Sequence, residues 1–244
     1  MWNALMWGAI SGSATFIGSW IGLYVHLPKK WIAMIMALGT GALIGATAYE
    51  LLGGAVREDG IVTSSIGFLS GALVFTLFDT WISSRGGGKR KRSKEVEEKE
   101  DQSGLAIFFG TLLDAIPESA MIGLSLISGG SISFALVTAI FISNLPEGLS
   151  SSVGLARNGY SKRKILFLWS IVLFLSAFSS LGGALLHDYA SSTVKSLLSA
   201  FAGGGIIAMV SSTMLPEAHE EGGPLVGLLT AVGILISLIL HELG

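Results

Sequence analysis

Residues 165–187 read ILFLWSIVLFLSAFSSLGGALLH and contain no Asp, Glu, Lys or Arg. A helix rises about 1.5 Å per residue, so this stretch can cross a hydrocarbon core of about 30 Å. A window of about 19 residues finds seven further apolar stretches of similar length. The complete set covers roughly residues 2–26, 31–53, 61–83, 104–128, 131–156, 165–187, 194–217 and 224–243. We expect every one of them to be a transmembrane helix.

The overall composition agrees with a membrane protein. Only 13% of the 244 residues are charged, about half of the roughly 25% found in soluble domains. The charges are clustered in a run around residues 85–101, which predicts a charged cytoplasmic loop over 84–103 between the third and fourth helices. The fold class predicted is therefore all-α and polytopic, with residues 1–244 as a single transmembrane domain. The net charge of −2 gives no basic surface for nucleic acid, and the lack of Cys excludes a thiolate metal site.

The distribution of basic residues predicts the orientation. If the N-terminus lies outside, 13 of the 15 Lys and Arg residues fall in cytoplasmic loops, and only Arg57 and Lys195 fall outside. Eight spans then place both termini on the extracytoplasmic side. The first stretch has no basic residues before it, so we expect a retained helix rather than a cleaved signal peptide. The expected location is the cell membrane, plasma or inner, as a multi-pass protein.

Small residues are frequent in the predicted helices. The chain contains 33 Gly, with runs such as GTGA at 39–42 and GGG at 203–205. Lipid provides no hydrophobic force between helices, and small residues allow their backbones to approach closely. We therefore interpret most of these glycines as packing surfaces.

Two hexapeptides place polar residues inside apolar stretches. Residues 114–119 read DAIPES and residues 143–148 read SNLPEG, so each has polar residues, an apolar spacer, Pro and Glu. A proline within a helix removes one backbone donor and releases a carbonyl about one turn earlier. The released carbonyls would be those of Leu113 and Ile142.

The carboxylates of these hexapeptides lack a local counter-ion. An ionised acid at membrane depth normally faces a partner of opposite charge, yet neither stretch contains Lys or Arg. A single carboxyl group could instead be protonated and hydrogen-bonded. The duplicated pattern favours a bound cation. The predicted ligands, all of them oxygen donors, are Asp114, Glu118, Ser143, Asn144 and Glu147.

With these hexapeptides the sequence resembles the ZIP (Zrt/Irt-like) divalent metal transporters. Their fourth and fifth helices typically carry His-Asn-x-Pro-Glu-Gly or a close variant. Further similarity lies in the charged loop before the fourth helix, in residues 154–164, and in residues 214–219, which read MLPEAH. The resemblance implies eight helices with both ends extracytoplasmic, a metal path lined by the fourth and fifth helices, and a homodimer.

The sequence departs from the family pattern at several positions. Asp114 and Ser143 stand where the family usually has His, and Ala115 replaces the Asn of the fourth helix. In the sixth helix many relatives contribute a Glu to a second metal position, and this chain offers Ser180 there. A second site is therefore depleted. An all-oxygen site suits manganese, iron(II) or magnesium better than a His-rich zinc site would, although carboxylates also bind zinc.

Three residues outside the hexapeptides are candidates for the ends of a metal path. Glu50, near the outer end of the second helix, could collect cations or be an ordinary interfacial acid. Glu217 and His219, at the inner end of the seventh helix, could form an exit relay or lie on a solvated segment with Glu220 and Glu221. We expect His26, His187 and His241 to be interfacial residues at helix ends.

These features predict a transporter of divalent metal cations, of the zinc, manganese or iron(II) class. The ion is its substrate, and no organic cofactor is expected. The expected partners are the lipid bilayer, metal ions and a second copy of the chain. We expect no enzyme, because a phosphate-binding Gly-Lys-Ser/Thr loop and a His-Glu-x-x-His motif are both absent. The alternative is a proton- or sodium-coupled transporter of a small organic solute that uses the same carboxylates.

Overall fold

The computed structural model describes residues 1–84, 100–125 and 133–243. Nearly all of this part of the chain is helical, and it contains no strand. The elements are α1 (Trp2–Tyr24), α2 (Lys29–Ala46), the π-helix η1 (Thr47–Leu52), α3 (Gly53–Ser84), α4 (Glu100–Ser125), α5 (Phe134–Arg157), α6 (Lys162–Tyr189), α7 (Ser192–Met209), the π-helix η3 (Val210–Met214), α8 (Leu215–Gly222) and α9 (Leu225–Leu243). Most of the predicted loop over 84–103 lies outside the described residues, and α4 already begins at Glu100.

The predicted apolar stretches agree with the observed helices. Within the described residues, five helical stretches are long and apolar enough to cross a bilayer, and one of them, Lys29–Trp81, contains two of the predicted spans. The other four are Phe134–Arg157, Lys162–Leu186, Ser192–Gly222 and Leu225–Leu243. α1 and α4 are also long, with 23 and 26 residues. The structure thus defines an all-helical, multi-pass membrane protein.

Two glycines end helices where the sequence predicts breaks. Gly60 has φ 81° and ψ 169°, which separates the segment that follows α2 from the apolar part of α3. Gly223 has φ 66° and separates α8 from α9. Positive φ is costly for any residue with a Cβ, so glycine is suited to both turns.

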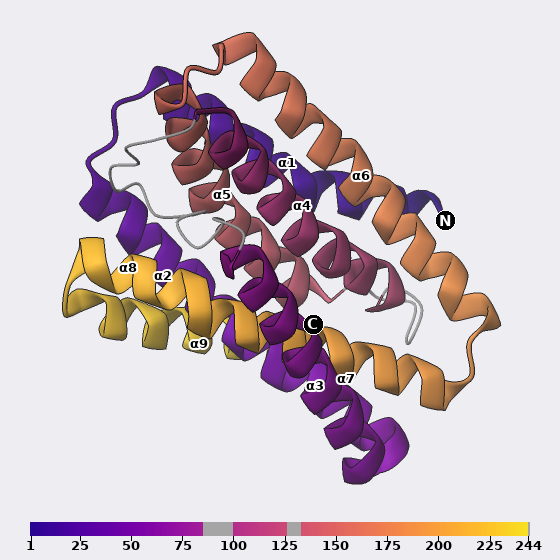
Figure 1. Cartoon of the computed structure of the whole chain (residues 1–244). Helices are drawn as coiled ribbons and strands as arrows, with labels where there is room; N and C mark the ends of the chain where they lie inside the picture. Colours follow the sequence, from indigo (N-terminus) through magenta and orange to yellow (C-terminus); the bar gives the residue numbers. More distant parts are fainter. Residues whose placement is uncertain (85–99, 126–132, 244) are drawn as a thin grey trace.

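Each helix packs tightly against one or two partners (Figure 1). α1 lies between α5 and α6, and α4 packs mainly on α6. α2 packs on α9 and α5, whereas α3 packs on α7. The largest apolar cluster of buried residues involves α2, α4, α5 and α7 with its continuation into α8.

Four of these pairs use the same arrangement of glycines. A Cβ built at Gly18 of α1 would overlap the carbonyl of Leu145 in α5, and one at Gly148 of α5 would overlap the carbonyl of Thr15. The same reciprocal contact, with glycines and carbonyls three residues apart on each helix, occurs in α2–α9, α3–α7 and α4–α6. The glycines of those pairs are Gly41 with Gly233, Gly71 with Gly204, and Gly123 with Gly183. Backbone therefore packs directly on backbone, as expected for small residues in membrane helices.

Two helices, α2 and α7, are each followed directly by a π-helical turn. α2 and α7 each have 18 residues and continue directly into η1 and η3. A π-helical turn is wider than an α-helical one, and it is frequent at functional sites. Glu50 lies within η1, and Glu217 follows η3 in the first turn of α8.

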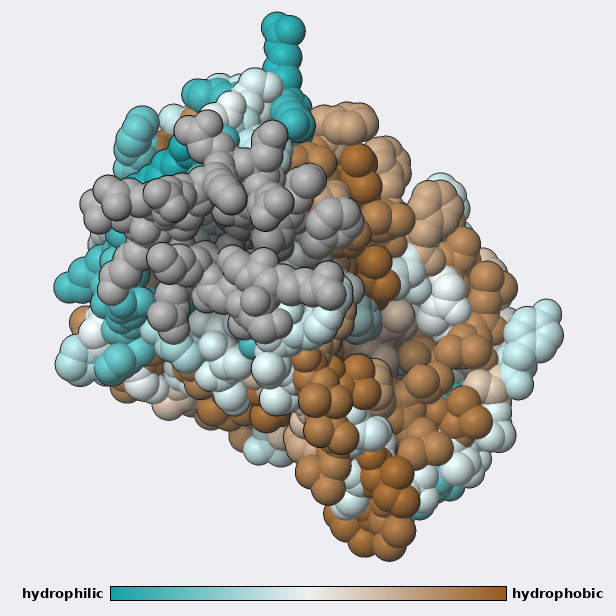
Figure 2. All heavy atoms as spheres, viewed as in Figure 1, coloured by the Kyte–Doolittle hydropathy of each residue, from teal (hydrophilic) through white to brown (hydrophobic). Residues whose placement is uncertain are grey.

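Apolar residues cover much of the outer surface of the helices. Figure 2 shows hydrophobic residues gathered over the part of the molecule where Figure 1 places α3 and α7, and hydrophilic ones at the opposite end of this face. Large exposed residues on α3 include Leu69, Leu73 and Leu77. This surface is suited to contact with lipid.

The neighbouring glycines of α6 provide a test of this packing. Gly183→Ala places a methyl group on the Ala120 carbonyl and must separate α4 from α6, whereas a Cβ at Gly182 meets no atom within 4 Å. We expect Gly183→Ala to lower stability by about 1–3 kcal/mol, and Gly182→Ala to leave it unchanged or slightly higher. Thermal unfolding of the purified protein in detergent measures both. Equal melting temperatures for the two variants would contradict this packing.

Candidate functional site

Two buried carboxylates lie on the helices that carry the hexapeptides. Glu118 of α4 is 2% exposed and Glu147 of α5 is 6% exposed. They are the only buried residues among the Asp, Glu, Lys and Arg side chains that the structure describes. Pro117 and Pro146 precede them inside helices that continue past each proline. The two carboxylates are thus placed in the interior of the bundle, as the sequence predicts.

The α5 half of the site is held by two neighbouring helices. Ser143 and Asn144 are 1% and 3% exposed. A Cβ at Gly39 of α2 would overlap the backbone of Ser143, so α2 approaches the chain closely at this point. On the other side of Glu147, Gly148 packs against Thr15 of α1. These backbone contacts restrict the movement of α5 on both sides of Glu147.

The hydroxyl of Ser143 is compatible with a ligand role. Its Oγ donates a hydrogen bond to the carbonyl oxygen of Ile140 at 3.0 Å. The hydroxyl proton therefore points at the backbone of the same helix. The lone pairs of the oxygen remain able to accept a hydrogen bond from water or to bind a cation.

Asp114 and the two positions of the depleted second site, Ala115 and Ser180, have different surroundings. Asp114 lies in α4, but its side chain is outside the described residues. Ala115 is buried in an apolar cluster with Leu155 and Trp169. Ser180 is fully buried, and its Cβ faces Gly8 of α1, so it belongs to the contact between α1 and α6. Among the described residues, no group of three or more His, Cys, Asp and Glu is arranged to hold a metal.

A larger cavity opens at one end of the bundle, and we call it the inner cavity. Its volume is about 720 Å³. The polar and charged residues that line it are His26, Lys29, Ser150, Arg157, Lys162, Glu217 and Glu221. Ser150 donates a hydrogen bond to Oε1 of Glu217 at 2.9 Å, and Lys29 forms an ion pair with Glu221 at 3.0 Å. His219, by contrast, is exposed and is not part of the lining.

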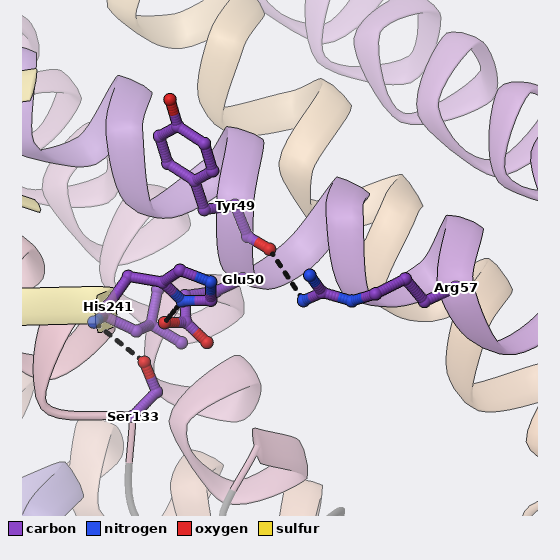
Figure 3. A network of polar contacts seen from close by, with 6 residues as sticks. Tyr49, Glu50, Arg57, Ser133 and His241 are labelled. Carbon is purple, nitrogen blue, oxygen red and sulfur yellow. Dashed lines mark hydrogen bonds and ion pairs between the residues drawn. The ribbon is translucent and has the colours of Figure 1, made fainter. Parts of the chain in front are cut away.

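A smaller cavity lies at the other end of α5, and we call it the outer cavity. It has a volume of about 280 Å³, and its charged or titratable lining residues are Glu50, Arg57, Glu58, Lys195 and His241. The Nδ1 of His241 lies 2.7 Å from Oε1 of Glu50. Figure 3 shows these two side chains facing each other, with Ser133 pointing toward the imidazole.

The hexapeptide of α5 lies between the two cavities. The outer cavity is lined by Ser133, Phe134 and Ala135, and the inner one by residues from Leu149 onward. At about 1.5 Å per residue, Ser143 is roughly 12 Å along the axis from Ala135, whereas Ser150 is roughly 4.5 Å from Glu147. Along α5, Glu147 is therefore closer to the inner cavity, whereas Glu118 of α4 lies three residues before Met121, which lines the outer cavity.

Several polar partners were not identified from the sequence. His241 was expected to be interfacial, but it pairs with Glu50 across 191 positions. Ser150 contacts Glu217, and Ser179 of α6 donates to the carbonyl of Ile116 at 2.6 Å, directly before Pro117. Serine and histidine are common residues, and no spacing in the chain marks these pairs, because they depend on how separate helices pack.

Comparison with known proteins shows the family of the chain. Residues 82–241 match the family model described as ZIP Zinc transporter. This match covers well over half of the chain, which therefore belongs to the ZIP zinc transporter family. The chain is also 28% identical over 217 residues to a protein of Arabidopsis thaliana named "Putative zinc transporter". The aligned part is 87% of this chain and 34% of the relative, so the chain spans about a third of the relative's length.

The hydrogen bond between Ser150 and Glu217 can be tested by stability. Ser150→Ala removes a donor to a partly buried carboxylate, which we expect to cost about 1.5–3 kcal/mol. Ser150→Thr keeps a hydroxyl and should cost less. Thermal unfolding in detergent compares the three proteins. A Thr variant as unstable as the Ala variant would show that the loss comes from packing rather than from the hydrogen bond.

Proposed function

We propose that this protein transports divalent metal cations across a membrane through a carboxylate site between α4 and α5. The observation that carries this proposal is the pair of buried acids, Glu118 and Glu147, each directly after a proline in a membrane helix. An ionised carboxylate is costly at this depth unless a positive charge is close. A transported cation supplies that charge. Membership of the ZIP zinc transporter family supports the same conclusion.

The two cavities support a route for the ion. The cation enters from the outer cavity at Glu50, reaches the site formed by Asp114, Glu118, Ser143, Asn144 and Glu147, and leaves by the inner cavity. Glu217 lines that cavity and accepts a hydrogen bond from Ser150. Ser150 itself lies about one helical turn after Glu147 in α5. Glu217 is thus the exit residue of the proposal, with His219 at the solvent beyond it.

The donors suggest the class of metal. All the proposed ligands supply oxygen, which suits manganese or iron(II) as well as zinc. The family model and the Arabidopsis relative carry zinc in their descriptions, so zinc belongs to the proposed substrates. Ala115 and Ser180 lie in helix contacts, so the proposal places a single metal position between α4 and α5.

The orientation and assembly of the protein are part of the same proposal. We place eight spans in the membrane with both termini extracytoplasmic, the loop over 84–103 in the cytoplasm, and the protein in the cell membrane. α2 and the apolar part of α3 count as separate spans because Gly60 interrupts the helix between them. From the family resemblance we further propose that the protein forms a homodimer.

Removing one carboxylate charge tests the metal site. If Glu118 and Glu147 hold a divalent cation, Glu118→Gln and Glu147→Gln should each weaken metal binding by at least about tenfold, which corresponds to about 1.4 kcal/mol. Both should also abolish most metal uptake into liposomes that contain the purified protein. If both acids are protonated and structural, Gln is nearly isosteric and binding should hardly change. The measurement is stabilisation of the native protein and both variants by zinc and manganese.

Two results would contradict the metal-transport proposal. One is undiminished stabilisation by metal in both Gln variants. The other is uptake of an organic solute that depends on a proton or sodium gradient and is independent of divalent metal, which would favour the alternative transporter. Gly182→Ala is a suitable control for reconstitution, because its Cβ meets no other atom within 4 Å.

The orientation has its own test, because the chain contains no Cys. Single cysteines replace Arg163 at the start of α6 and Ser192 at the start of α7, two exposed positions at opposite ends of α6. In intact cells, an impermeant thiol reagent should label the cysteine at position 192 and leave the one at position 163 unlabelled until the membrane is opened. Labelling of both positions in intact cells would overturn the proposed topology.

A further inference from the structure

Glu50 and His241 form a pair at the wall of the outer cavity. The Nδ1–Oε1 distance is 2.7 Å, and 21% of the Glu50 side chain and 23% of the His241 side chain are exposed. Glu50 comes from η1 and His241 from the end of α9, and Ser133 at the start of α5 points toward the imidazole (Figure 3). Three separate elements thus bring a carboxylate, an imidazole and a hydroxyl to one place.

Local structure holds both side chains of the pair in position. The ring of Tyr49 stacks on the imidazole of His241, with ring centroids 5.7 Å apart and an angle of 23° between the planes. Glu50 follows Tyr49 within the π-helix η1, and π-helical turns are frequent at functional positions. The stacked ring restricts rotation of the imidazole, so its Nδ1 stays directed at the carboxylate.

The formal charges around the cavity cancel when Glu50 is counted among them. Arg57 and Lys195 carry two positive charges, and Glu50 and Glu58 carry two negative ones. Arg57 donates to the backbone carbonyl of Tyr49 at 3.4 Å and reaches it from the side away from His241 (Figure 3). Glu58 accepts a hydrogen bond from Ser196 at 3.3 Å. A divalent cation that enters the cavity therefore meets no excess of positive charge.

We propose that Glu50 and His241 form a loading site for a divalent cation. The ion replaces the proton between the two groups, which is released to water, and binds the carboxylate oxygen and the imidazole nitrogen. The Ser133 hydroxyl and water complete its shell. The onward passage of this ion rests on the proposed transport function, whereas the binding itself does not.

The small number of protein ligands suits a loading site. Structural zinc sites have four protein ligands, and the described residues contain no group of three or more His, Cys, Asp and Glu arranged for a metal. A transported ion must bind well enough to enter and weakly enough to leave. A site with two strong ligands meets both conditions.

The imidazole makes this site chemically different from the inner one. Nitrogen ligands favour zinc and cobalt over manganese, whereas the donors proposed around Glu118 and Glu147 are all oxygen. The loading site therefore adds a preference for the softer ions before they reach the carboxylates.

Titration of the purified full chain in detergent with Co²⁺ tests the proposal. Visible absorption and calorimetry follow binding to the native protein, Glu147→Gln, Glu50→Gln, His241→Gln and, as a matched control, Glu58→Gln. The Glu147→Gln protein should retain a weak Co²⁺-binding event. Glu50→Gln and His241→Gln should each weaken that same event by at least about tenfold. Glu58→Gln removes a charge from the same cavity and should change this event less than about twofold.

His241→Asp distinguishes a ligand from a structural partner. Aspartate can still bind the ion but replaces nitrogen with oxygen, so the variant should bind metal and shift its preference toward Mn²⁺ relative to Zn²⁺. An unchanged ratio of Mn²⁺ to Zn²⁺ affinity would show that His241 does not contact the ion.

The outcomes separate this inference from the proposed function. A Co²⁺ event that is unchanged in Glu50→Gln overturns the loading site, whatever the uptake experiment shows. A Co²⁺ event that depends on Glu50 and His241, in a native protein that transports no metal, supports the loading site and overturns the transport proposal instead.

Discussion

Direct contact between helix backbones is the interaction on which the rest of this structure depends. In lipid, apolar side chains gain little by leaving their surroundings, so helices associate through close packing. Here four helix pairs place a glycine of each helix against a carbonyl of the other, at the same spacing in every pair. Any side chain larger than hydrogen at these positions would separate the helices.

This packing also determines the surroundings of the candidate metal site. Gly148 directly follows Glu147 and packs on α1, and Gly39 brings α2 against the backbone of Ser143. The carboxylate and the neighbouring polar groups of α5 are therefore held between two helices that cannot easily move apart. A rigid arrangement of this kind suits the binding of an ion, because the ligands need little reorganisation when the ion arrives.

The ends of the proposed path share a structural device. η1 and η3 each continue an 18-residue helix; η1 contains Glu50 and η3 is followed by Glu217, and each of these glutamates lines a cavity. Glu50 pairs with His241 in the outer cavity, and Glu217 pairs with Ser150 in the inner cavity. The two ends differ in chemistry, because the outer one offers an imidazole and the inner one a hydroxyl next to the carboxylate.

The sequence by itself determined the helical, membrane-embedded class of the protein, and it singled out the polar residues of α4 and α5 that we propose as a metal site. Membrane helices follow from local composition, so the predicted stretches agree with the observed helices, and the breaks at Gly60 and Gly223 fall where turn residues occur. The buried positions of Glu118 and Glu147 were predictable for the same reason, since the prolines and the absence of Lys and Arg from the two apolar stretches are local features. Only the tertiary structure decided which residues meet across helices. It paired His241 with Glu50 and Ser150 with Glu217, turned Ser180 toward α1, and gave Gly183 a contact that Gly182 lacks. Such contacts depend on the rotation and the register of packed helices, and neither quantity is encoded in any short stretch of the chain.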